Sequence, residues 1–147
     1  SVVYALLFGV IVGTVTQWLL GGIVPLALQG ASMDRLPLGQ SIVLSLGAGI
    51  YEELVFRVIL VGFLLAVFKS AGLSRGQAGV FAALLAALLF SAFHYVGPYA
   101  YPLELGSFTF RFLAGLAFSA LYLVRGFGIA AWTHALYDVF LVVARGG

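Results

Sequence analysis

The sequence contains no cysteine, so disulfide bonds and thiolate metal sites are excluded. Charge is also scarce: charged side chains make up 8% of the 147 residues, against roughly 25% in soluble domains. The net charge is only +2, and no run of basic residues interleaves with aromatic ones. We therefore expect no nucleic-acid partner.

Hydrophobic residues make up 63% of the chain and gather in long continuous runs. A transmembrane barrel would require alternating apolar and polar residues instead. The predicted fold class is all-α: a polytopic integral membrane bundle of about five transmembrane helices, in contact with membrane lipid. The length predicts a single domain over residues 1–147. Because the sequence begins with Ser1 rather than Met, we expect it to be a segment of a longer chain.

Glycine, proline and charged residues divide the apolar runs into separate predicted spans. Each is close to or longer than the roughly 20 residues that cross a bilayer. Many of the 19 glycines lie inside these spans, where they allow helices to approach closely in lipid. The predicted spans are residues 2–28, 40–68, 77–96, 107–124 and 127–144.

The second span carries two adjacent acids and an arginine, Glu52, Glu53 and Arg57, in an otherwise apolar run. An ionisable side chain at the centre of a membrane helix costs about 2.5–3.5 kcal/mol, so such groups usually mark a reaction or transport path. Glu53 and Arg57 are four residues apart and are expected to pair. Glu52 lies about 140° away from Arg57 around a regular helix. It lacks a local cation and is the candidate general base. The alternative is a buried charge cluster that only fixes helix packing.

Two other spans supply imidazoles. His94 ends the third span, where a lone histidine is often an interfacial residue. In the fifth span His134 and Asp138 are four residues apart, so the carboxylate can fix the tautomer of the imidazole, although such a pair can also simply join helices. The cost of burying ionisable groups separately on three helices predicts one shared pocket, equipped to activate water.

The ordered motifs Glu52-Glu53-x-x-x-Arg57, Phe90-x-x-x-His94 and His134-x-x-x-Asp138 resemble the signature of the CaaX protease and bacteriocin-processing family, also called CPBP or Abi. The resemblance covers roughly residues 40–143. It implies an intramembrane endopeptidase in the cytoplasmic membrane of a prokaryote. The substrate would be a peptide or membrane protein, prenylated in the CaaX case or linked to bacteriocin self-immunity. By this match Glu52 is the base, His94 helps to hold the water, and His134 with Asp138 contributes the oxyanion side.

One position departs from the family pattern, because many members have Asn where this chain has Asp138. An oxyanion stabiliser must donate a hydrogen bond. An ionised aspartate cannot donate, whereas a protonated one can. Asp138 is therefore either a neutral donor or an ionised group that orients His134, and the sequence leaves both open.

Zinc is the alternative cofactor, with Glu52, His94 and His134 as its candidate ligands. The sequence lacks the His-Glu-x-x-His motif of many zinc proteases. Adjacent Glu52 and Glu53 cannot both point at one ion from a regular helix without strain. We therefore favour a glutamic mechanism without metal or other cofactor over a metalloprotease.

The rival hypothesis is a non-catalytic transporter or immunity protein that uses the ionisable groups as a proton or ion relay. A relay needs a polar path to both membrane faces, and the first and fourth spans carry no charge deep inside. Arg111, near the start of the fourth span, is expected to extend to the interface. Contact with a substrate carboxylate is the alternative for this arginine.

Overall fold

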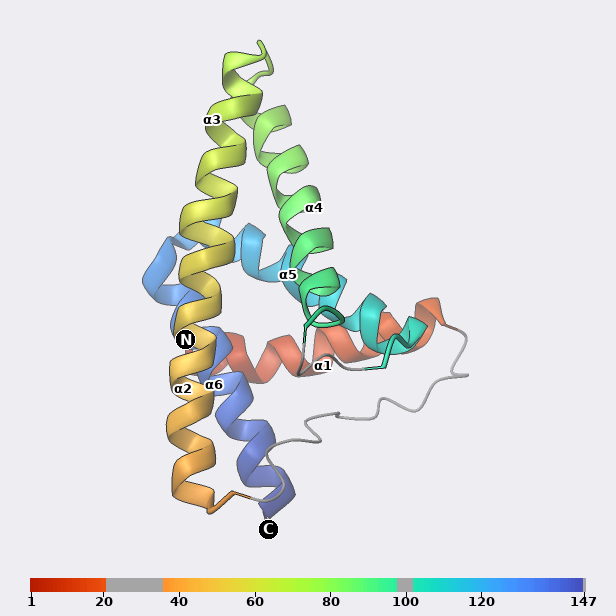
Figure 1. Cartoon of the computed structure of the whole chain (residues 1–147), viewed down its shortest axis with the longest axis vertical. Helices are drawn as coiled ribbons and strands as arrows, with labels where there is room; N and C mark the ends of the chain where they lie inside the picture. Colours follow the sequence, from red (N-terminus) through yellow and green to blue (C-terminus); the bar gives the residue numbers. More distant parts are fainter. Residues whose placement is uncertain (21–35, 98–101, 147) are drawn as a thin grey trace.

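The computed structural model describes residues 1–20, 36–97 and 102–146, and every regular element within them is a helix. The predicted all-α fold class is therefore confirmed (Figure 1). The elements are α1 (Val2–Leu19), α2 (Leu38–Glu53), the π-helical segment η1 (Leu54–Val61), α3 (Gly62–Ser70), α4 (Arg75–Phe93), α5 (Leu105–Arg125) and α6 (Phe127–Gly146).

The segments α2, η1 and α3 follow one another without a break and form one long helix that contains the predicted second span. At 1.5 Å per residue this helix is about 50 Å long. A short turn then reverses the chain into α4, which returns beside α3 (Figure 1). Ser74 caps α4: its hydroxyl accepts a hydrogen bond from the backbone of Gln77, whose side chain accepts one from the Ser74 backbone.

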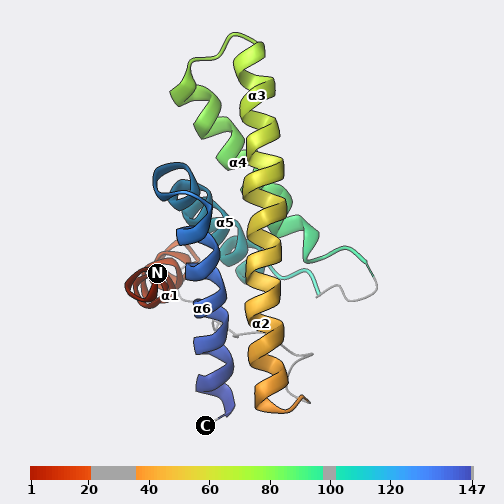
Figure 2. The same cartoon turned by 90° about the vertical axis from the view of Figure 1, so that its left-hand side faces the viewer.

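The lower half of the long helix packs along α6, and α4 packs against α5 (Figure 2). Helix α1 lies crosswise to the long helix and contacts α5 and α6. Its Phe8 stacks on Phe118 of α5 at 4.2 Å between ring centroids and meets the edge of Tyr137 of α6 at 5.0 Å. This aromatic cluster holds three helices together beside the ionisable groups of the long helix.

Two glycines bring helices into backbone contact. A Cβ atom added to Gly49 of α2 would lie 2.7 Å from the Cα of Ala135 in α6. One added to Gly115 of α5 would lie 3.0 Å from the Cα of Ala87 in α4. Because Gly49 precedes Glu53 by one helical turn and Ala135 follows His134, the first close approach sets the distance between the acidic motif and the imidazole.

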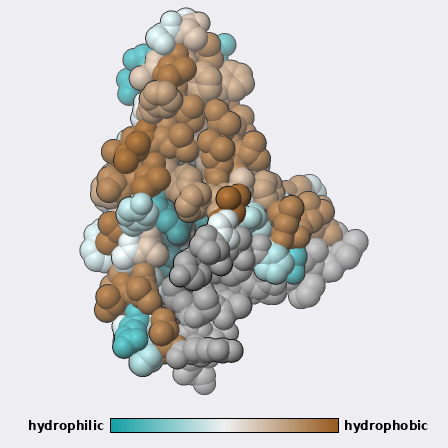
Figure 3. Space-filling model, viewed as in Figure 1, coloured by the Kyte–Doolittle hydropathy of each residue, from teal (hydrophilic) through white to brown (hydrophobic). Residues whose placement is uncertain are grey.

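The outer surface of the described bundle is largely apolar, as its upper half in Figure 3 illustrates. Trp18 and Val124 are each 78% exposed, which is unfavourable in water and ordinary in lipid. Among the described residues, four helices are long and apolar enough to cross a membrane: α1, α4, α5 and the 127–144 stretch of α6. The chain is an integral membrane protein with a helical bundle. The first span was predicted to reach residue 28, but α1 ends at Leu19, and residues 21–28 lie outside the described part.

Replacing Gly49 by Ala should weaken the bundle, because the new methyl group would push α2 away from α6. Overpacking of this kind costs about 1–3 kcal/mol, which exceeds the roughly 1 kcal/mol that Ala gains over Gly in a helix. Thermal unfolding of the purified protein in detergent measures the effect. Gly47→Ala is the matched control, because nothing lies within 4 Å of a Cβ atom there. Equal melting temperatures for both variants would show that the close approach is unimportant.

Candidate active site

The centre of the site is a fully buried ion pair. Nε of Arg57 lies 3.1 Å from Oε2 of Glu53, as the four-residue spacing predicts, and neither side chain is exposed. The Arg57 guanidinium also lies 4.6 Å from the ring centroid of Phe90 and 5.6 Å from that of Phe118, and its Nη2 is 3.5 Å from the carbonyl oxygen of Gly115. Desolvated cation–π contacts of this kind are worth about 2 kcal/mol. The pair thus anchors the long helix to α4 and α5.

The helix that carries this pair is not the regular α-helix assumed from the sequence. Directly after Glu53 the chain enters the π-helical segment η1, which contains Arg57 and continues to Val61. Such wider turns are rare and are frequently found at functional sites. The η1 segment contains no proline or glycine, so its sequence offers no signal for the change from α-helix to π-helix. The angular separation of Glu52 and Arg57 calculated for a regular helix therefore does not hold here.

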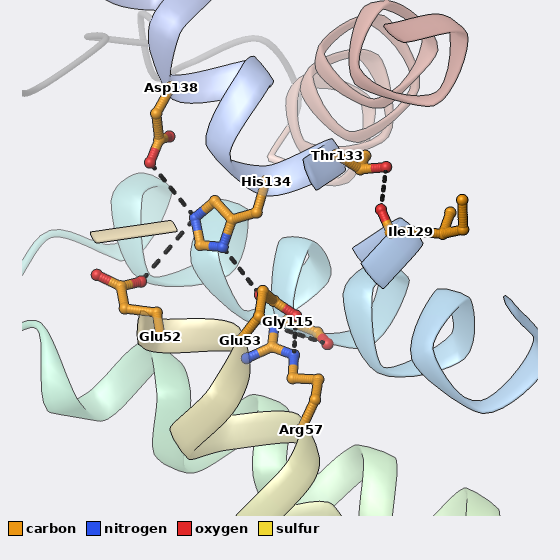
Figure 4. A network of polar contacts seen from close by, with 8 residues as sticks. All are labelled: Glu52, Glu53, Arg57, Gly115, Ile129, Thr133, His134 and Asp138. Atoms are coloured by element: carbon orange, nitrogen blue, oxygen red, sulfur yellow. Dashed lines mark hydrogen bonds and ion pairs between the residues drawn. The ribbon is translucent and has the colours of Figure 1, made fainter. Parts of the chain in front are cut away.

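His134 of α6 is the side chain on which the acids converge (Figure 4). Its Nδ1 lies 2.8 Å from Oε1 of Glu53, so Glu53 contacts both Arg57 and the imidazole. One face of the His134 imidazole packs on an apolar ring: Phe118 stacks on it at 4.5 Å between ring centroids. The sequence left open whether Asp138 orients His134 or acts as a neutral donor. The shortest carboxylate contact of the His134 ring comes from Glu53, on a different helix.

Glu52 and Asp138 lie on the more open side of His134. The Nε2 atom of the ring is 3.9 Å from Oε2 of Glu52 and 3.6 Å from Oδ2 of Asp138. Both distances exceed hydrogen-bond length, and contacts of this length are commonly bridged by water. Their side chains are 27% and 31% exposed, whereas that of Glu53 is not exposed at all. The two adjacent glutamates therefore occupy different environments.

His94 follows the last residue of α4. Among the described residues, the ion pairs join His134 with Glu52, Glu53 and Asp138 and do not extend to His94. Its Nδ1 lies 2.9 Å from the carbonyl oxygen of Phe90. A carbonyl oxygen only accepts, so Nδ1 carries the proton and Nε2 has the lone pair. The Phe90 ring contacts both histidines: its centroid lies 5.0 Å from that of the His94 ring and 6.2 Å from that of the His134 ring.

The candidate zinc ligands do not form a metal-binding group in the described part of the chain. They were predicted to be Glu52, His94 and His134, but within the described part of the chain no group of three or more His, Cys, Asp or Glu residues could hold a metal ion. We therefore derive no chemical step through a metal.

Sequence reasoning missed two residues that shape the site. Phe118 supports the His134 ring, and the backbone carbonyl of Gly115 lies next to Arg57. Phe118 is one of thirteen phenylalanines in the chain, and a backbone carbonyl has no sequence signature. Neither could have been distinguished from ordinary packing residues before the helices were placed.

A family model described as "Type II CAAX prenyl endopeptidase Rce1-like" matches residues 34–140, which include all of the ionisable residues of the site. The chain belongs to this family. Comparison with curated proteins and with solved structures finds no match. Family membership agrees with the resemblance predicted from the three motifs and supports an intramembrane endopeptidase that acts on a peptide or protein at the membrane.

Replacing Arg57 by Gln should destabilise the fold, because it leaves the buried carboxylate of Glu53 without its cation. Breaking a buried pair in this way costs about 3–5 kcal/mol. Arg125→Gln is the matched control. This arginine is exposed, and its Nη1 donates a hydrogen bond to the hydroxyl of Tyr4 at 3.0 Å. Its loss should change stability by less than about 0.5 kcal/mol. Thermal unfolding of both variants, compared with wild type, tests whether the buried pair matters more than an exposed arginine.

Proposed function

We propose that the chain is an intramembrane endopeptidase in which Glu52 activates a water molecule, without a metal or other cofactor. The observation that carries this proposal is the difference between the two glutamates. Glu53 is buried between Arg57 and His134, which gives it a structural task. Glu52 is partly exposed beside Nε2 of His134, where a substrate and a water could reach it. The family match supports peptide hydrolysis over the proton or ion relay.

In this mechanism Glu52 removes a proton from water as the oxygen attacks the carbonyl carbon of the scissile bond. His94 holds the same water through the lone pair of Nε2, since its Nδ1–H points to the Phe90 carbonyl. The tetrahedral intermediate then breaks its C–N bond. The proton held by Glu52 passes to the leaving amine, and the products are a new carboxylate and a new amine.

The oxyanion of that intermediate needs hydrogen-bond donors. Nδ1 of His134 donates to Glu53, and a protonated Nε2 would donate on the open side, where Glu52 and Asp138 lie. Asp138 can serve in either of the two ways left open by the sequence. Protonated, it adds a second donor; ionised, it helps to hold the imidazole in its donor form from 3.6 Å.

The substrate that we propose is a prenylated peptide or protein that ends in a C-a-a-X sequence, the motif to which the family description refers. A prenyl chain brings the substrate to the lipid phase that surrounds the bundle. The location that we propose, a prokaryotic cytoplasmic membrane, follows from the resemblance alone.

Replacing Glu52 by Gln should abolish cleavage of a prenylated peptide while the fold is retained. We expect kcat/KM to fall by about 100-fold or more, the usual contribution of a general base. His94→Gln should lower kcat/KM as well. The double variant should be little worse than Glu52→Gln alone, because the two residues act on one water. Melting temperatures confirm that each variant is folded. A Glu52→Gln protein that cleaves at near-normal rate would remove Glu52 as the base.

The metal-free mechanism predicts that activity survives strong chelation. Protein purified in metal-free buffer and treated with a chelator should cleave the same peptide at the rate of untreated protein. Elemental analysis of the same sample provides the control. Stoichiometric zinc that is lost together with activity would instead support the metalloprotease alternative.

A further inference from the structure

A second cluster of polar side chains lies where α4 meets α5, around Arg111. Nη1 of Arg111 lies 2.9 Å from the hydroxyl of Tyr95 and 2.7 Å from that of Ser107. The guanidinium carbon lies 5.5 Å from the centroid of the Tyr95 ring. The Tyr95 and Ser107 hydroxyls also contact each other. Arg111 is partly buried, and these contacts come from Tyr95, just after α4, and from Ser107 of α5.

This cluster adjoins the candidate active site. Tyr95 directly follows His94, so their Cα atoms are about 3.8 Å apart. Arg111 contacts Tyr95 directly, through the Tyr95 hydroxyl at 2.9 Å. Ser91 of α4 fixes the two helices at this point, because its hydroxyl donates to the carbonyl oxygen of Phe108 in α5, at 2.8 Å. Arg111 therefore has a defined position beside Tyr95, the residue that follows His94.

The proposed substrate carries a charge that such a cluster could recognise. A C-a-a-X sequence ends the chain, so every peptide bond within it lies at most three residues from a free carboxylate. Three extended residues span about 10 Å. Arginine is the residue best suited to bind a carboxylate, through two parallel hydrogen bonds, and neighbouring hydroxyl groups can add further donors.

We propose that Arg111, positioned by Tyr95 and Ser107, binds the C-terminal carboxylate of the substrate and thereby selects chain ends over internal peptide bonds. This inference rests on the proposed function, because it takes the substrate to be a C-terminal peptide. It makes Arg111 a specificity-determining residue, whereas Glu52 and His94 carry out the chemistry.

The test compares two prenylated peptides that differ only at the C-terminus, one with a free carboxylate and one with an amide. Wild-type protein should cleave the acid with a kcat/KM about tenfold or more above that of the amide, as expected for one charge-assisted contact. Arg111→Gln should lower kcat/KM for the acid to the level of the amide and leave the amide almost unchanged. Arg111→Lys should recover part of the preference. Arg125→Gln, at the other end of α5, is the matched control and should keep the full preference.

A binding measurement separates this inference from the proposed function. The Glu52→Gln variant should bind the fluorescently labelled acid about tenfold more tightly than the amide. Adding Arg111→Gln should remove that difference. If Glu52→Gln binds both peptides equally, or if Arg111→Gln weakens both equally, the assignment of Arg111 is wrong whether or not the protein is a peptidase. If the binding preference holds but wild type cleaves neither peptide, the carboxylate site stands and the proposed hydrolysis fails.

Discussion

The Glu53 carboxylate lies between two nitrogen-bearing side chains, with Arg57 at 3.1 Å and His134 at 2.8 Å. Through these contacts one buried acid joins the long helix to α6, and through Arg57 it reaches the carbonyl of Gly115 in α5. An uncompensated charge in such a place would cost several kcal/mol, so each of the three side chains depends on the others. The Gly49–Ala135 contact makes the arrangement feasible, because only a glycine allows α2 to come this close to α6.

Burial also separates the tasks of two adjacent residues of the same type. Glu53 has no exposed surface and its oxygens face Arg57 and His134. Glu52 points to the open side of the same imidazole, together with Asp138. A general base must be reached by water and substrate, whereas a structural carboxylate must not. The buried network therefore supplies a fixed imidazole, and the chemistry that we propose takes place on its exposed edge.

The helices and the pairing of Glu53 with Arg57 could be predicted from the sequence, because both follow from local rules: apolar run length and the four-residue spacing. The contact between Glu53 and His134 could not, because it depends on how two helices distant in sequence pack. The π-helical segment η1 also escaped prediction, since its backbone conformation has no residue signature here. The contacts of His94 could not be predicted either: its Nδ1 lies against the Phe90 carbonyl, and the Phe90 ring contacts the rings of both histidines.

The most direct test of the shared role of Glu53 is a double-mutant cycle with His134, measured as free energies of unfolding in lipid bicelles. The four proteins are wild type, Glu53→Gln, His134→Gln and the double variant. If the carboxylate and the imidazole stabilise each other, the double variant should lose less stability than the sum of the single variants, by about 1 kcal/mol or more. Losses that add to within about 0.5 kcal/mol would contradict the account, because independent residues behave in that way.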